Sequence, residues 1–112
     1  MQIYDESHMG DLRKKLEESL LEWEDTSSKK MFGCPGYTVG GTLFASLRDD
    51  ALVLHKLSDD EREQFAESLG GVPFEGNGKT MSKWLQLEFT DESQLEDLLF
   101  AAKASYESAR AQ

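Results

Sequence analysis

Between Lys29 and Leu57, apolar residues alternate with small or polar ones, whereas elsewhere they recur at every third or fourth position. Alternation with a period of two is typical of a half-buried β-strand. Two pairs interrupt this pattern, Gly40-Gly41 and Asp49-Asp50, and both stand where hairpin turns are needed. We therefore predict a three-stranded antiparallel meander over residues 29–57, with one face packed on helices and the other partly open.

Before the meander, helical spacing predicts a first helix between Asp5 and Glu24. The segment from Asp25 to Ser28 has no apolar residues and is interpreted as a loop. The apolar stripe of this helix is expected to face the core and consists of Met9, Leu12, Leu16, Leu20 and Trp23.

A second helix is predicted to begin after Ser58, which forms a capping box with Glu61, and to end at Gly70-Gly71, where a left-handed residue is needed. A third helix is predicted to begin near Thr90, a good N-cap residue. Its inward residues are expected to be Leu95, Leu98, Leu99, Ala102 and Tyr106.

The segment between the last two helices predicts one or two further strands around the glycine-rich turn at 75–78. Leu85, Leu87 and Phe89 alternate with polar residues there, and Trp84 falls on the polar side. The predicted order is α-β-β-β-α-β-β-α. This order indicates an α+β fold, an antiparallel sheet with helices packed on one side.

Length and composition fit one domain over residues 1–112, since the chain has 112 residues of which 38% are hydrophobic. No signal peptide or membrane-spanning run is visible, so we expect a cytoplasmic protein without a membrane partner. The single cysteine, Cys34, excludes an intrachain disulfide and agrees with a reducing compartment.

The net charge of −10 is unevenly distributed. The segments predicted to be helical hold 18 of the 22 acidic residues and 6 of the 12 basic ones. The remainder holds 4 acidic and 6 basic residues, among them Arg48 and Lys56. One interpretation is that the acidic helix faces are simply exposed to solvent. The alternative is a molecule with an acidic helical side and a mildly basic sheet side.

No catalytic, cofactor or metal motif is present, so we expect a protein that is not an enzyme. Gly78-Lys79-Thr80 resembles the end of a phosphate-binding loop, but Pro73 stands where its first glycine should be, and the loop precedes a strand. Cys34 and His55 are predicted to lie on strands separated by a third, without a group to orient them. Two distant histidines and one cysteine cannot form a zinc site.

The remaining candidates for function are lysines and aromatics near the glycine-rich turns. An aromatic on the polar face of a strand can anchor a partner or stack on a base. The alternative to an interaction surface is that the lysines are scattered over the sheet and that a loop or helix covers the tryptophan. The candidate interaction residues are Lys29, Lys30, Phe32, Lys79, Lys83 and Trp84.

Several short motifs in this region resemble one known family, the N-terminal domain of the TfoX (Sxy) competence regulators. They are Lys30-Met31-Phe32-Gly33, Gly41 to Ala45, Leu52 to Lys56, Pro73-Phe74 and Gly78 to Ser82. The resemblance runs from about Lys29 to Leu87 and implies an α+β domain related in shape to the YjbR/MmcQ group. It also implies control of genes for DNA uptake, alongside a cyclic-AMP-responsive activator, and supplies no catalytic residues.

The sequence departs from the family pattern at Cys34-Pro35-Gly36 and at Lys83-Trp84. Full TfoX proteins carry a second, helical domain, so we expect a stand-alone N-terminal domain here. The favoured hypothesis is a non-enzymatic regulatory module that binds a protein partner connected with transcription. The alternative is direct DNA binding through the lysines, which the net charge disfavours and a strong salt dependence would reveal.

Overall fold

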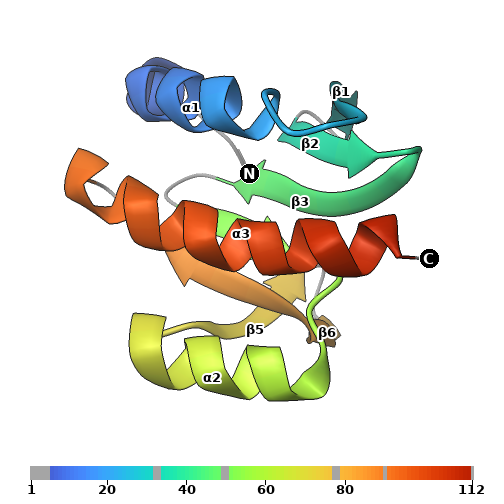
Figure 1. Cartoon of the computed structure of the whole chain (residues 1–112). Coiled ribbons are helices and arrows are strands. Elements are labelled where there is room, and N and C mark those ends of the chain that lie inside the picture. Colours follow the sequence, from blue (N-terminus) through green and yellow to red (C-terminus); the bar gives the residue numbers. More distant parts are fainter. Residues whose placement is uncertain (1–5, 32–33, 49–50, 77–78, 90, 112) are drawn as a thin grey trace.

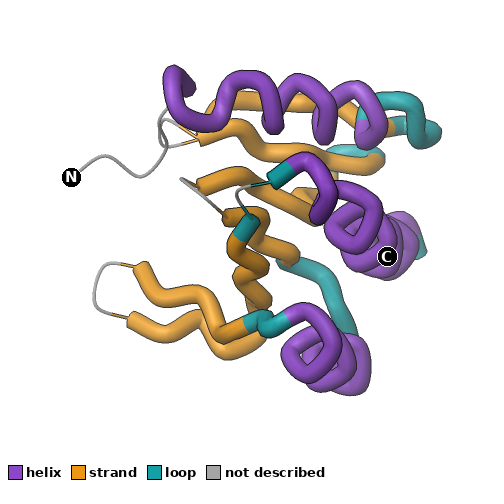
Figure 2. Tube along the Cα trace, turned by 90° about the vertical axis from the view of Figure 1, so that its left-hand side faces the viewer, coloured by secondary structure: helices purple, strands orange, loops and turns teal. Residues whose placement is uncertain are grey.

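Six antiparallel strands form one sheet in the order β1-β2-β3-β4-β6-β5, and three α-helices pack on one of its faces (Figures 1 and 2). The computed structural model describes residues 6–31, 34–48, 51–76, 79–89 and 91–111. The predicted α+β class, with helices on one side of the sheet, is confirmed. The elements are α1 (Glu6–Leu20), β1 (Thr26–Met31), β2 (Cys34–Val39), β3 (Thr42–Arg48), β4 (Ala51–Leu54), α2 (Asp59–Leu69), β5 (Val72–Gly76), β6 (Lys79–Glu88), a 3₁₀ turn (Glu92–Gln94) and α3 (Leu95–Arg110).

The first part of the sheet has four strands, one more than the predicted meander. Strand β1 pairs with β2 from Thr26↔Val39 onward, so the interpretation of 26–28 as loop was wrong. The chain turns at Asp25, whose φ is 63°, and the Thr26 hydroxyl donates to the carbonyl of Trp23 at 2.7 Å. The strand escaped prediction because it is a polar edge strand with no apolar alternation.

The turn between β2 and β3 is Gly40-Gly41, as predicted. Both residues have positive φ, 56° and 87°, which glycine adopts without steric cost and which matches the twist of the flanking strands. The other predicted turn, Asp49-Asp50, lies outside the described residues, although Arg48 and Ala51 pair on either side of it.

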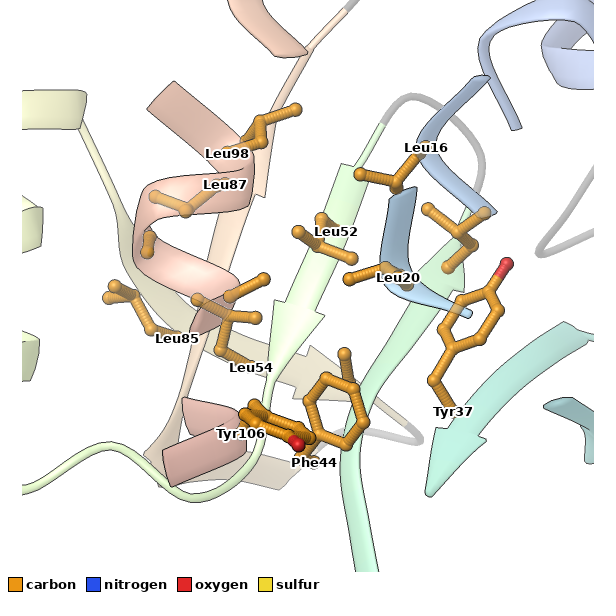
Figure 3. Packing of buried hydrophobic residues seen from close by; sticks show 14 of the residues in the cluster. Leu16, Leu20, Tyr37, Phe44, Leu52, Leu54, Leu85, Leu87, Leu98 and Tyr106 are labelled. Carbon is orange, nitrogen blue, oxygen red and sulfur yellow. The ribbon is translucent and has the colours of Figure 1, made fainter. Parts of the chain in front are cut away.

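The register of the sheet separates an apolar face from a mixed one. Leu47, Leu52 and Leu87 are cross-strand neighbours on the face toward the helices, and a second row places Leu54 beside Leu85. These side chains meet Leu16, Leu20, Leu98 and Tyr106 from the helices in one core (Figure 3). The opposite face carries none of the described helices, and we call it the helix-free face.

A β-bulge in β3 joins the sheet to α3. Phe44 has no partner on β2, because Tyr37 pairs with Ala45 and Thr38 with Leu43. The Phe44 ring packs edge-on against Tyr106 at 5.6 Å between centroids. Its carbonyl accepts a hydrogen bond from the hydroxyl of Ser105 at 2.7 Å, and Ser105 in turn accepts one from the Lys56 amide at 3.0 Å.

The ends of the later helices follow the predicted capping chemistry in part. The capping box of Ser58 and Glu61 is present, and Gly70 ends α2 with a φ of 72°. The predicted N-cap Thr90 lies outside the described residues. The side-chain cap belongs to Asp91, which starts a 3₁₀ turn that precedes α3.

Replacing Ser105 by alanine should destabilise the fold. The fully buried hydroxyl accepts from the Lys56 amide, which would lose this partner, and donates to the Phe44 carbonyl, which would keep only its hydrogen bond from the His55 amide. We expect Ser105→Ala to lower the free energy of unfolding by about 1–3 kcal/mol in urea denaturation. Ser108→Ala, at a half-buried position on the same helix, is the matched control and should change it by less than about 1 kcal/mol. Equal effects of the two variants would contradict this role.

Candidate functional site

The lysines predicted to form one interaction surface lie on separate parts of the sheet. Lys29 and Lys30 are exposed on the edge strand β1, and their cross-strand partners, Gly36 and Pro35, show that they point to opposite faces. Gly36 pairs with Ser46, which places Lys29 on the helix-free face. Lys83 is exposed on β6, and three strands separate β6 from β1.

Two other predicted residues are placed only in part. Phe32 lies outside the described residues. Lys79 is the first residue of β6, so the segment resembling a phosphate loop does lead into a strand.

Trp84 packs against two rings of the helix-free face. Its ring lies 4.2 Å from that of His55 and 5.7 Å from that of Phe74, centroid to centroid. Trp84 is half-buried and Phe74 is buried. The indole is therefore a packing element of this face and not a freely exposed anchor.

The β5–β6 hairpin curls over the helix-free face. The guanidinium of Arg48 on β3 lies 4.8 Å from the ring centroid of Phe74 on β5, although β4 and β6 separate these strands in the sheet. Figure 2 shows the hairpin bending away from the helices. This curl accounts for the burial of Val53, whose neighbours Ser46 and Gln86 place it on this face.

Arg48 is the last residue of β3, and its side chain lies on the helix-free face. Its Nη1 donates to the sulfur of Cys34 at 3.6 Å, while its Nε is buried without a hydrogen-bond partner among the described residues. Thiol sulfur is a weak acceptor, so the guanidinium keeps most of its donor capacity unused.

His55 lies on the same face as this arginine and is held in its neutral form. Its side chain is only 9% exposed, and its Nε2 shares a 2.9 Å hydrogen bond with the Ser46 hydroxyl. The Nδ1 atom is buried with no hydrogen-bond partner in the described part of the chain. Burial, together with the positive charges of Arg48 and Lys56, lowers the pKa of His55 to about 4.

These contacts limit the chemistry of the face. Ser46 and His55 form a serine–histidine pair, but among the described residues no carboxylate orients the imidazole as a catalytic triad requires. Cys34 contacts Arg48, and β3 separates its strand from β4, which directly precedes His55, as predicted. Within the described ranges, no three His, Cys, Asp or Glu side chains gather closely enough to hold a metal ion.

The sequence interpretation missed the grouping of Ser46, Arg48 and Phe74. Ser46 and Arg48 alternate with Leu47 along β3, and this alternation was a signal that they share the open face. The approach of Phe74 had no comparable signal, because it depends on the curl of the hairpin.

Comparison with protein families gives one match, the TfoX N-terminal domain, over residues 18–109. The match covers all six strands, α2 and nearly all of α3. The chain belongs to the TfoX N-terminal domain family. The resemblance inferred from the motifs is thereby confirmed. A comparison with curated proteins found no match. In the described part of this TfoX domain, every helix is too short or too polar to cross a membrane.

The neutral His55 predicts that the domain loses stability on acidification. Its pKa is about 4 in the folded protein and about 6.5 when unfolded, so between these values the unfolded chain binds the extra proton. This contribution is fully present above pH 6.5 and is lost as the pH falls toward 4. Between pH 7 and 4.5, the wild type should lose about 2 kcal/mol more unfolding free energy than His55→Gln.

Urea denaturation of both proteins at the two pH values measures this difference. The carboxylates titrate in both, so their contribution cancels in the comparison. Equal losses in the wild type and in His55→Gln would show that His55 is not held neutral by the fold.

Proposed function

We propose that this domain is a non-enzymatic regulatory module that binds a protein partner through its helix-free face. The observation that carries the proposal is that none of the described helices covers this face, on which the side chains of Arg48 and Trp84 stay half-buried. Arginine and aromatic residues are enriched at the centres of protein interfaces.

The charge of the face also distinguishes it from the rest of the molecule. Exposed Lys29 on β1 and half-buried Arg48 on β3 both lie there, whereas the helices carry most of the acidic residues of a chain with net charge −10. Such a surface suits a partner segment that is itself acidic or neutral and that avoids the acidic helices.

Membership of the TfoX N-terminal domain family supports a regulatory role for the module. We extend the proposal to the control of DNA-uptake genes in the cytoplasm, through a component of the transcription machinery. The Ser46–His55 pair, with no third group to activate it among the described residues, favours binding over catalysis.

Direct DNA binding stays the alternative. Its candidate lysines are spread over two separated strands, and Lys29 and Lys30 point to opposite faces. Few phosphates could be neutralised at once by such an arrangement. Binding to a duplex that weakens steeply with salt would favour the alternative over the protein partner.

Position-dependent photo-crosslinking in host cells tests the proposal. Val72 is 48% exposed and lies on the helix-free face beside Gln86, and Phe100 is 68% exposed on α3. A photoreactive phenylalanine analogue at Val72 should yield a defined crosslinked protein product. The same analogue at Phe100 is the matched control and should yield none.

The crosslink should also weaken in a Lys29→Glu background, which reverses an exposed charge on the same face. Crosslinking at Phe100 but not at Val72 would place the partner on the helices and contradict the proposal. A Val72 crosslink to nucleic acid instead of protein would support the alternative.

A further inference from the structure

Arg48 is the one described arginine without a carboxylate partner. The chain has four arginines, and acidic residues outnumber basic ones by 22 to 12. Each of the other three forms an ion pair: Arg13 with Glu17, Arg62 with Asp59, and Arg110 with Glu24. Although the chain has many carboxylates, Arg48 differs from the other three arginines because it forms no ion pair among the described residues.

The environment of Arg48 does not compensate its charge. Its two recorded contacts are the Cys34 sulfur and the face of the Phe74 ring. The ring offers a cation–π attraction, which is weaker than the interaction of a guanidinium with a carboxylate away from bulk water. Glu88 lies in the same cross-strand row, but Ala51 stands between them and no ion pair forms.

His55 supplies an independent observation on the same face. It is 91% buried, and its Nδ1 has no partner among the described residues, while its Nε2 bonds Ser46, two positions from Arg48 along β3. An unsatisfied buried polar atom opposes folding and calls for an explanation. Arg48 and His55 therefore both retain unused hydrogen-bonding capacity on one face, as far as the described residues show.

We propose that the helix-free face holds a binding site for an oxyanion, a carboxylate or a phosphate group, centred on the guanidinium of Arg48. Arginine presents five N–H donors in a planar fork that fits both groups, and the Phe74 ring lies 4.8 Å from the centre of that fork. Exposed Lys29, on the same face, adds a second positive charge at the edge of the sheet. The site rests on Arg48 and His55 and does not depend on the proposed protein partner.

The side-chain Nε–H resonances of the four arginines, observed by ¹H–¹⁵N NMR, test the site directly. The full chain is titrated with inorganic phosphate and, separately, with acetate, at constant ionic strength maintained with chloride. We expect the Arg48 resonance to shift and to reach saturation. The resonances of Arg62 and Arg110 should stay in place, because carboxylates already bind the guanidinium groups of these two residues. Saturation with phosphate identifies a phosphate site, and saturation with acetate a carboxylate site.

Two variants sharpen the test, with the ring protons of His55 as the reporter. Arg48→Gln should weaken the apparent affinity for the saturating anion by roughly tenfold or more. Lys103→Gln, which removes an exposed charge on α3, should leave it unchanged.

The wild-type titration alone can overturn the proposal. If neither anion produces a saturable shift at Arg48, or if Arg62 and Arg110 shift in parallel with it, the site does not exist. This result would leave the crosslinking test of the protein partner unaffected, so the two proposals fail independently.

Discussion

The packing of the β5–β6 hairpin onto the helix-free face is the interaction on which the character of this domain depends. All three α-helices lie on the other face, so the helix-free side of Val53 and Ala51 would otherwise face water. The rings of Phe74, Trp84 and His55 pack against one another on this side, and both Val53 and Ala51 are buried. Because the cover is a hairpin and not a helix, it leaves part of Arg48 and Trp84 accessible.

Within this arrangement, the two faces of the sheet have different roles. The helix side is apolar and closed, and the buried Ser105 hydroxyl adds a second hydrogen bond to the Phe44 carbonyl there. On the helix-free side, the guanidinium of Arg48 has no carboxylate partner and the Nδ1 of His55 no hydrogen-bond partner among the described residues. Unsatisfied groups of this kind oppose stability, and proteins retain them mainly where a ligand or partner completes them. This member of the TfoX N-terminal domain family thus combines a closed, apolar face with a second face on which polar groups lack partners among the described residues.

Local patterns predicted the fold well because they act over short distances. The Gly40-Gly41 turn, the Ser58–Glu61 capping box and the Leu85–Leu87 alternation each report a local backbone or burial requirement. Strand β1 was missed because an exposed edge strand needs no apolar face. The candidate site was predicted less well. Lys29 and Lys83 were grouped because both stand near glycine-rich turns, but they lie on strands that are not adjacent in the sheet. The contact of Phe74 with Arg48 depends on the curl of the β5–β6 hairpin, which no local sequence pattern encodes.

The most direct test of this account is the stability of Arg48→Met, which keeps an unbranched apolar stem and removes the charge. If Arg48 is an uncompensated cation kept for binding, its removal should leave the free energy of unfolding in urea within about 1 kcal/mol of the wild type, or raise it. A loss of about 3 kcal/mol or more, as expected when a buried ion pair is broken, would show that Arg48 holds the fold together and would contradict the account.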